Sequence, residues 1–304
     1  MGKKTVRVVT TAALVTAAAF AAIPAFLARQ LAKPNGQSLE QEKEWEKEHG
    51  LWNDFDDFRQ EAYRVKGWKD YELNCLYVET APGSRKYVII SHGYSSNRYG
   101  AVKYVDTYRD LGYNCILYDV RGHGENQKTA VSLGNFEAHD LLNLIEDCYE
   151  RYGAEIELGL HGESMGSSIS LCVLGYDAKV RFVVADCGFA SLYELIRAGY
   201  QKLHLGFLIN PVNWMTRALY QFDMKESSGR DALKGNTVPI CLIHGADDTF
   251  IMPSNSEELK AATDGYSELH LVDGAAHAMS REVLGEEAYT KIVAAFLDHI
   301  EKMK

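Results

Sequence analysis

The sequence predicts an α/β fold in which a mostly parallel β-sheet is covered by helices on both faces, behind an apolar N-terminal segment. Three observations predict it. After about Glu61, short β-rich runs alternate with helical patterns. Several runs are continuously apolar, such as Val88-Ile89-Ile90 and Phe182-Val183-Val184-Ala185, as expected of strands buried on both faces. Near its start, the chain carries an uncharged apolar stretch of about 20 residues, enough to cross a bilayer as a helix.

Size and composition limit the functions that this chain can have. The 304 residues fit one large domain plus a short extra segment, or two small domains, and 46% apolar residues are enough for a sizeable core. The net charge of -10 argues against nucleic acid as a partner, because phosphate binding needs a basic surface. Much of the acidity lies in one run, Glu40 to Glu61, which we interpret as a solvated face.

The apolar stretch, Val8 to Leu27, predicts that residues 1–32 are a transmembrane anchor or a signal segment. Lys3, Lys4 and Arg7 precede it and an acidic run follows, which places the N-terminus inside and the domain outside a cell membrane crossed once. The alternative is a signal peptide cleaved after Ala19-Phe20-Ala21, which would leave a secreted protein. We favour the uncleaved anchor, because the apolar run exceeds the ~7–15 residues of a signal core and continues past that site.

Residues 33–60 are expected to form a polar linker or helix. Pro34-Asn35-Gly36 interrupts regular structure, and Leu39 to His49 is interpreted as a solvated helix or linker that spaces the domain from the membrane. No chemistry is assigned to this segment. The remaining residues, 61–304, are expected to form the α/β domain.

Within that domain the patterns predict seven strands and five helices. The expected strands are Glu72–Val78, Tyr87–Ser91, Asn114–Tyr118, Glu157–His161, Arg181–Ala185, Pro239–His244 and Glu268–Val272. The expected helices are Arg98–Leu111, Asn135–Arg151, Ser164–Leu174, Ser254–Thr263 and Ser280–Lys302. About fifty residues separate Asp186 from Val238, although a crossover needs only about a dozen. We interpret residues 192–236 as an inserted helical lid over the sheet edge, with plain extra packing as the alternative.

The strongest local signal is Gly162-Glu163-Ser164-Met165-Gly166, which lies between an expected strand and an expected helix. A serine hydroxyl is a poor nucleophile at neutral pH, so it must be held exposed beside a base. A tight strand-to-helix turn does this by straining the serine backbone, and glycines two positions on either side leave room for neighbouring segments. Ser164 is therefore the predicted nucleophile, at a helix N-terminus whose free N–H groups favour an oxyanion.

A second motif, Ser91-His92-Gly93-Tyr94-Ser95-Ser96-Asn97, directly follows an apolar strand. It predicts a backbone loop that folds over the nucleophile. The N–H groups of Tyr94 and Met165 are then the expected oxyanion hole. The alternative is an ordinary turn between a strand and a helix.

The acid and the base come from two later loops. In Ile243-His244-Gly245-Ala246-Asp247-Asp248, either aspartate could orient a catalytic imidazole. We choose Asp248, because the pattern His-Gly-x-x-Asp-x-x-apolar fits it, and interpret Asp247 as a turn or capping residue.

Three histidines follow the acid. His270 lies within a strand and His299 on the last helix, where structural or exposed roles are expected. His277 lies in the loop after the last strand, which reaches the sheet edge where the serine emerges. The chain order Ser164, Asp248, His277 is the one expected of this arrangement.

The cysteines show no CxxC pair and no cysteine–histidine cluster at metal-ligand spacing, so no metal site is predicted. They are Cys75, Cys115, Cys148, Cys172, Cys187 and Cys241. Most lie within apolar runs, where a free cysteine packs as a small buried hydrophobe. One disulfide stays possible if the domain is exported.

These motifs, with Asp119-Val120-Arg121-Gly122-His123-Gly124, resemble the α/β-hydrolase superfamily from roughly Tyr63 to the C-terminus. The chain looks most similar to the serine hydrolase branch related to prolyl oligopeptidases and serine aminopeptidases, which includes small bacterial membrane-anchored hydrolases. The resemblance implies an eight-stranded, mostly parallel sheet with one antiparallel strand, and an acyl-enzyme mechanism without metal or organic cofactor. It also implies that His123 is a wall of the pocket rather than a second base.

The expected function is a serine hydrolase that cleaves an ester or other acyl bond, since the apolar lid favours an acyl substrate. The alternatives are a serine peptidase of aminopeptidase type and a non-catalytic, membrane-tethered binding module. The expected partners are a small acyl or peptide substrate and the membrane. The motifs leave the substrate and the oligomeric state open.

Overall fold

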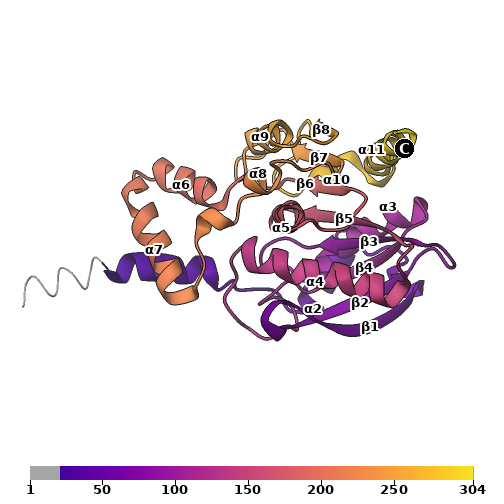
Figure 1. Cartoon of the computed structure of the whole chain (residues 1–304), viewed down its shortest axis with the longest axis horizontal. Helices are drawn as coiled ribbons and strands as arrows, with labels where there is room; N and C mark the ends of the chain where they lie inside the picture. Colours follow the sequence, from indigo (N-terminus) through magenta and orange to yellow (C-terminus); the bar gives the residue numbers. More distant parts are fainter. Residues whose placement is uncertain (1–20, 304) are drawn as a thin grey trace, which may run out of the picture.

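The computed structural model describes residues 21–303, and its centre is one eight-stranded β-sheet (Figure 1). The strands are β1 Arg59–Lys66, β2 Glu72–Glu79, β3 Lys86–Ser91, β4 Asn114–Tyr118, β5 Glu157–Glu163, β6 Val183–Asp186, β7 Ile240–Gly245 and β8 Ser267–Val272. They lie in the order β1-β2-β4-β3-β5-β6-β7-β8. β2 pairs antiparallel with both β1 and β4, and all pairs from β4 to β8 are parallel. The predicted fold class is confirmed, with β2 as the one strand that runs against the others.

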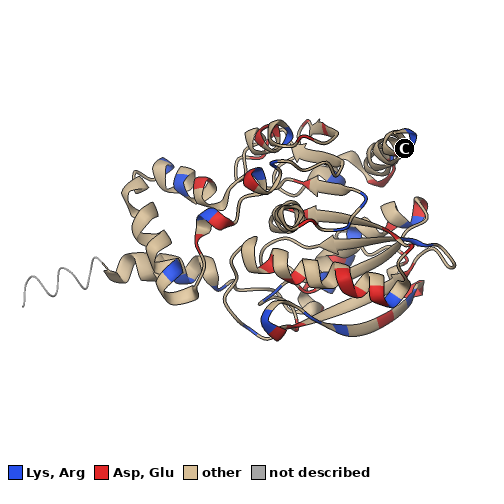
Figure 2. Cartoon of the chain, in the orientation of Figure 1, with Lys and Arg blue, Asp and Glu red and all other residues tan. Residues whose placement is uncertain are grey.

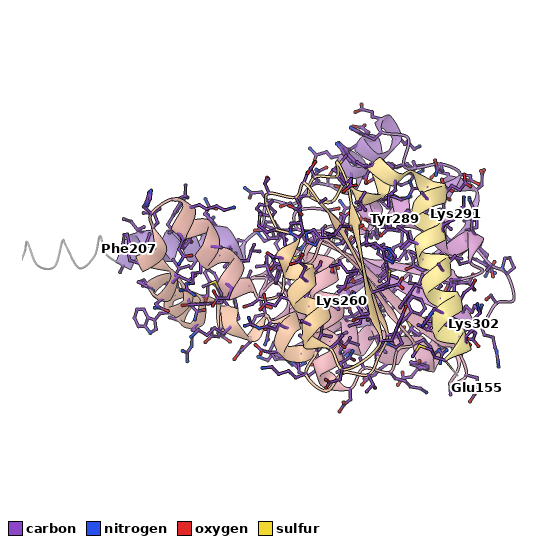
Figure 3. All side chains as sticks on the ribbon, turned by 90° about the horizontal axis from the view of Figure 1, so that it is seen from above. Glu155, Phe207, Lys260, Tyr289, Lys291 and Lys302 are labelled. Atoms are coloured by element: carbon purple, nitrogen blue, oxygen red, sulfur yellow. The ribbon has the colours of Figure 1, made fainter. Side chains whose placement is uncertain are left out.

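Helices cover both faces of the sheet. They are α2 Leu39–Glu48, α3 Val105–Asp110, α4 Asn135–Tyr152, α5 Met165–Cys172, α6 Leu192–Lys202, α7 Ile209–Tyr220, α8 Gly229–Ala232, α9 Ser254–Ala262, α10 Ser280–Leu284 and α11 Glu286–Lys302. The core on one face contains side chains of α4, α5 and α9, and the core on the other contains those of α3 and α11. Seen from above, α11, with Lys291 and Lys302, runs along one side of the molecule (Figure 3). All six cysteines are buried, as the apolar context predicted.

Two elements differ from the prediction. The strand β1 was not expected, because six of its eight side chains are exposed at the sheet edge and give no apolar pattern. The expected helix over 280–302 is two helices, α10 and α11. Gly285 separates them with a φ of 76°, a left-handed conformation that glycine adopts without the cost of a Cβ.

Between β6 and β7 the chain leaves the sheet and forms α6, the 3₁₀ helix η5 (Gly206–Leu208) and α7, which stand away from it (Figure 1). Phe207 marks their far end in the view from above (Figure 3). Leu192, Ile209 and Val212 join the main core. Other large apolar side chains of this insertion are exposed: Leu203, Leu205, Phe207, Trp214 and Leu219. The two inserted helices therefore lie where the sequence expected them, and α6 to α7 is called the lid below.

Residues 21–32 form a helix beside the lid, whose helix α6 carries both acidic and basic residues in Figure 2. Ala28 and Ala32 on this helix are fully buried, and the Ala32 carbonyl accepts a hydrogen bond from Val131 N at 2.9 Å. This end of the apolar stretch is thus docked on the domain. Most of the predicted anchor lies in residues 1–20, outside the described residues. Within 21–303, no helix is both long enough and apolar enough to cross a bilayer.

The helix α2 is not the solvated spacer expected for this segment. It begins with a capping box between Ser38 and Gln41, and it packs against the 3₁₀ helix η3 (Arg98–Tyr104). Its buried face carries two carboxylates, Glu42 and Glu46. The other acidic residues between Glu40 and Glu61 are exposed, as expected of a solvated face, and only these two differ. A helix normally buries apolar residues, so acidic residues at these two positions give no sign of packing in the sequence.

Candidate active site

β5 runs into α5 through a sharp turn at Ser164. The serine has φ 53° and ψ -114°, a strained conformation for a residue with a Cβ. A Cβ at Gly162 would lie 2.3 Å from the Gly166 carbonyl carbon, and one at Gly166 would lie 2.1 Å from the Ser91 oxygen. Both glycines are therefore required by close backbone approach, as the motif predicted.

The structure brings Ser164, His277 and Asp248 into one hydrogen-bonded line. Ser164 Oγ lies 2.9 Å from His277 Nε2, and His277 Nδ1 lies 2.6 Å from Asp248 Oδ2. Because a carboxylate only accepts, Nδ1 carries the proton and Nε2 is left to accept from the serine hydroxyl. This is the arrangement that a serine nucleophile and its base require.

Asp248 is held in its ionised form. Its Oδ1 accepts from Phe250 N and Ile251 N, each at 2.9 Å. Burial of the carboxyl group raises its pKa, but hydrogen bonds from His244 and His277 outweigh burial and hold the pKa of Asp248 well below its usual range. At neutral pH it can therefore orient His277 and stabilise the imidazolium.

His244 was noted in the sequence only as a residue of the motif around Asp248, and in the structure its side chain lies beside Asp248. Its Nε2 lies 2.8 Å from the Ile251 carbonyl and 3.4 Å from Asp248 Oδ2. A carbonyl only accepts, so Nε2 carries the proton, and Nδ1 accepts from Ser256 Oγ at 2.6 Å. His244 thus fixes the loop that presents the acid. Its place at the end of β7, four residues before Asp248, is the signal that could have found it.

The rejected candidates lie elsewhere. Asp247 is exposed and belongs to the turn after β7. His270 Nε2 lies 2.8 Å from Glu268 Oε1 on β8, and His299 stacks on Tyr266 with ring centroids 4.4 Å apart. None of these three side chains lines the cavity that contains Ser164.

The loop after β3 lies against the elbow. A Cβ at Gly93 would be 3.7 Å from Ser164 Cβ, which places the following residue, Tyr94, beside the nucleophile. Among the described residues, no hydrogen bond uses the backbone N–H of Tyr94 or of Met165. Met165 is the first residue of α5, where an N–H has no acceptor within the helix. Both donors predicted for the oxyanion hole are therefore free to bind a ligand.

Two buried histidines support this loop. Val120 N donates to His92 Nε2 at 2.9 Å, so the proton lies on Nδ1, which donates to the Gly93 carbonyl at 2.8 Å. His123 packs edge-on against the rings of Tyr94 and His92. Burial lowers the pKa of both histidines to about 4, so both are neutral. His123 lies behind Tyr94 and is not among the residues that line the cavity, unlike the wall position that the family resemblance implied.

A cavity of about 370 Å³ opens onto Ser164 and His277. The oxyanion loop forms part of its wall, and the side chains of Glu42, Trp45, Glu46, Lys103, Glu163, Phe250, Met279 and Glu282 also line it. The acidic side of this cavity was not predicted from the sequence. Except for Glu163 inside the elbow motif, the carboxylates come from α2 and α10, which only the fold brings together.

A second cavity, of about 600 Å³, lies between α6 and residues 249–258. Apolar side chains such as Leu195, Ile196 and Met252 contribute to its lining. Phe250 lines both cavities, and its ring contacts His277 with centroids 5.0 Å apart. The apolar cavity is therefore next to the catalytic groups.

One group of metal-ligand type occurs among the described residues, formed by Cys241, Glu268 and His270 on β7 and β8. Spacing in the sequence does not reveal it, because it depends on pairing of neighbouring strands. Glu268 already accepts from His270 at 2.8 Å and from Tyr266 at 2.9 Å. The three side chains thus satisfy one another, and Cys241 lies near the start of β7, away from the strand ends that carry the triad.

Comparison with known proteins identifies the fold family. The sequence pattern of the alpha/beta hydrolase fold matches residues 86–237, which is half of the chain. The match includes β3 to β6, the oxyanion loop and the elbow.

Two of the curated proteins that match by sequence show the range of similarity. The uncharacterized protein YqkD of Bacillus subtilis is 28% identical over 265 residues, which are 85% of this chain and 86% of that protein. Alpha/beta hydrolase domain-containing protein 17C of Xenopus tropicalis is 29% identical over 226 residues, which are 71% of this chain and 64% of that protein. The match thus spans less than two thirds of the vertebrate protein's length.

Solved structures share the fold. The Pyrococcus furiosus esterase Pf2001 has a TM-score of 0.64 and 22% identity, over 82% of this chain and 96% of that chain. Acetyl xylan esterase 1 of Thermoanaerobacterium has a TM-score of 0.59 and 16% identity, over 90% and 97%. The acylaminoacyl peptidase of Pyrococcus horikoshii has a TM-score of 0.58 and 18% identity, over 81% of this chain but 41% of that chain.

Proposed function

The chain belongs to the alpha/beta hydrolase fold family, and on that premise we propose that it is a serine hydrolase that cleaves carboxylic esters through an acyl-enzyme. The observation that carries the proposal is the line of hydrogen bonds from Ser164 through His277 to Asp248, at 2.9 and 2.6 Å. A hydroxyl, an imidazole and an ionised carboxylate at these distances form a nucleophile, its base and the group that orients the base.

In the proposed mechanism, His277 Nε2 takes the Ser164 proton as Oγ attacks the ester carbonyl carbon. The N–H groups of Tyr94 and Met165 donate to the oxyanion, and His277 then protonates the leaving alcohol. Water enters, loses its proton to His277 and attacks the acyl-enzyme, which releases the acid and restores Ser164. Loss of one oxyanion donor typically costs about 10²–10³ in rate.

An ester with an apolar acyl group fits the lid side of the site. The cavity between α6 and residues 249–258 is lined by Leu195, Ile196 and Met252 and shares the side chain of Phe250 with the catalytic cavity. Burial of each acyl methylene there is worth about 0.8 kcal/mol. Two of the structurally similar proteins are named esterases, which supports the same reaction class.

We also propose that the chain is anchored in the cell membrane by its first residues, with the catalytic domain outside. The uncharged stretch Val8 to Leu27 and the preceding basic residues support this orientation. The docked helix of residues 21–32 and the exposed apolar side chains of the lid lie on one side of the molecule (Figures 1 and 3). An anchored domain would have this side next to the bilayer.

An active-site fluorophosphonate probe tests the nucleophile. Wild type is expected to be labelled, and Ser164→Ala to lose labelling together with p-nitrophenyl butyrate hydrolysis, by about 10⁴-fold or more, since triad members act as a unit. The readout is gel fluorescence of the labelled protein alongside the hydrolysis rate.

Ser167→Ala is the matched control. Ser167 lies on the same helix, is fully buried and has an Oγ without a hydrogen-bond partner in the described structure. It should keep both labelling and turnover. Equal labelling of wild type and Ser164→Ala would refute the assignment.

A further inference from the structure

The catalytic cavity has an acidic side that the proposed ester hydrolysis does not use. Four carboxyl groups line it, those of Glu42, Glu46, Glu163 and Glu282, beside a single cation, Lys103. They come from α2, β5, α10 and η3. Burial of charge is costly unless each charge is paired, so an excess of carboxylates in a cavity calls for an explanation.

Lys103 forms salt bridges with two of the four, although Glu282 Oε2 has no hydrogen-bond partner in the described structure. Its Nζ lies 2.5 Å from Glu163 Oε2 and 3.0 Å from Glu282 Oε1. The Tyr104 hydroxyl also donates to Glu163 Oε2 at 2.6 Å. This buried network joins η3 to the elbow and to α10, and a structural role is enough to explain it.

Glu42 and Glu46 form no salt bridge within residues 21–303. Their residues are 6% and 1% exposed, and each has a buried Oε2 without a hydrogen-bond partner in the described structure. Only Oε1 of Glu42 is engaged, by Ser96 Oγ at 2.6 Å. The approach of α2 depends on Gly100, where a Cβ would lie 2.5 Å from Glu42 Oε1. Gly100 thus leaves room for a carboxylate that accepts a hydrogen bond from Ser96 but forms no salt bridge with any residue that the structure describes.

We propose that this side of the cavity is a subsite for an ammonium group of the substrate, held by Glu42 and Glu46 next to Ser164. The ester would therefore carry a protonated amine. The subsite rests on the proposed function for its substrate, but its existence can be measured without turnover. An ammonium supplies the N–H donors that the two unpartnered oxygens lack.

The chemistry of the lining favours an organic cation over a metal ion. Trp45 and Tyr94 line the same cavity, and aromatic faces attract ammonium groups. In residues 21–303, the carboxylates of this cavity do not form a group of three whose ligand atoms converge on one point, as a metal ion needs. A larger cation can contact groups that are further apart.

Binding of a cation should release a proton. Burial raises the pKa of Glu46 to about 9, although the charge of Lys103 opposes this shift. The carboxyl group is therefore protonated at neutral pH when no substrate ammonium is bound. Glu42, Glu163 and Glu282 face it as well and disfavour its ionisation. An ammonium beside Glu46 favours the carboxylate, so binding and proton loss are coupled.

The test is calorimetric titration of the full-length Ser164→Ala variant in neutral detergent. One titrant is n-butylammonium chloride, and the other is its neutral analogue butan-1-ol. The ammonium is expected to bind at least 10-fold more tightly than the alcohol. In the variant that also carries Glu42→Gln and Glu46→Gln, this preference should fall to within about 2-fold. Repetition in two buffers of different ionisation enthalpy should show proton release by the parent and none by the double Gln variant.

The matched control carries Glu40→Gln and Glu44→Gln, which remove two charges from the exposed face of the same helix. It should keep the ammonium preference, which separates a local subsite from the general field of α2. Folding is checked by the melting temperature of every variant. Equal affinity for the ammonium and the alcohol in the parent would overturn the proposal, as would a preference that survives in a folded double Gln variant, or binding of CaCl₂ in place of the ammonium.

Failure of the proposed function gives a different result. If no ester is hydrolysed by wild type but the ammonium binds Ser164→Ala and needs Glu42 and Glu46, the subsite stands and the reaction assignment fails. If neutral butyrate esters are hydrolysed but the ammonium shows no preference, the subsite fails and the hydrolase stands.

Discussion

Two residues of the site are held in states that cost free energy. Ser164 has a positive φ of 53°, and Glu46 is a nearly fully buried carboxyl group with an unpartnered oxygen. Strain and unpaired polar groups of this kind persist where the surrounding packing imposes them, and they concentrate at functional sites. At the residue scale, stability is given up where the site needs a particular geometry or charge.

The raised pKa of Glu46 predicts a pH-dependent stability. Between its usual value of 4.5 and about 9, the unfolded chain loses the Glu46 proton while the folded chain keeps it. The unfolded state then binds fewer protons, so the free energy of unfolding falls as pH rises. The Glu46→Gln substitution removes this pH-dependent decrease in the free energy of unfolding, because a Gln side chain does not ionise. We expect the variant to match wild type near pH 4 and to be more stable at pH 8, by about 1–3 kcal/mol, as measured by urea unfolding.

Glu44→Gln is the control for this prediction, because Glu44 is exposed two residues away on the same helix. It should change the free energy of unfolding little at either pH. A gain for Glu46→Gln of the same size at pH 4 and pH 8 would show that ionisation of this group is not the cause.

At the scale of elements, the helix α6 lines the cavity that would hold the acyl group of the proposed ester. Gly199 on α6 lines the apolar cavity, and a Cβ there would meet no atom within 4 Å. A glycine inside a helix costs about 1 kcal/mol relative to alanine. The open space beside this position is therefore available to a substrate, or to a larger side chain.

Gly199→Phe is expected to fill part of this cavity and to select for short acyl groups. kcat/KM for p-nitrophenyl octanoate should fall by about 10-fold or more, because loss of two buried methylenes costs about 1.6 kcal/mol. kcat/KM for p-nitrophenyl acetate should stay within about 3-fold, since its acyl group does not reach α6. Initial rates over a series of chain lengths give the measurement.

Gly199→Ala separates cavity filling from helix stabilisation, because it gives the helix its propensity gain with little added volume. It should raise the melting temperature and leave the chain-length profile nearly unchanged. A parallel loss on acetate and octanoate in Gly199→Phe would contradict an acyl pocket at α6.

At the scale of the whole molecule, the apolar N-terminal stretch is divided between two roles. Its last residues belong to the helix of 21–32, whose Ala28 and Ala32 are fully buried and whose Gln30 carbonyl accepts from the Tyr94 hydroxyl at 3.2 Å. Tyr94 carries a predicted oxyanion donor. The helix that follows the proposed anchor is thus also attached to the loop over the nucleophile.

A chain that lacks residues 1–20 should leave the membrane fraction and still be folded. We expect the full chain to stay in the pellet after carbonate extraction, and the shortened chain to appear in the supernatant with unchanged p-nitrophenyl butyrate turnover. Recovery of the full chain in the supernatant would contradict the proposed anchor.

Deletion of residues 1–32 is the companion variant. It also removes the buried alanines and the contact to Tyr94, so its melting temperature should drop by at least about 4 °C relative to the chain lacking 1–20, the shift expected for a loss of about 2 kcal/mol. Equal melting temperatures would mean that the helix of 21–32 contributes nothing to the fold.

The sequence by itself determined the features that local patterns encode. Continuous apolar runs identified the parallel strands, because strands covered on both faces must be apolar along their length. Gly162, Ser164 and Gly166 identified the elbow, because this spacing lies between an expected strand and an expected helix. The identities of Asp248 and His277 followed from their motifs and chain order, before the distances that join them were known.

Tertiary structure alone decided what depends on contacts between remote segments. The edge strand β1 and the packed face of α2 were not predicted, because polar side chains at a sheet edge or on a buried helix face give no apolar period. The juxtaposition of Glu42 and Glu46 with Lys103 and Ser164 exists only when α2 folds back onto η3. A glutamate on a solvated helix and one in a buried cavity are the same residue type in the sequence. They differ physically in their burial and in the distance to a partner, which only the folded structure sets.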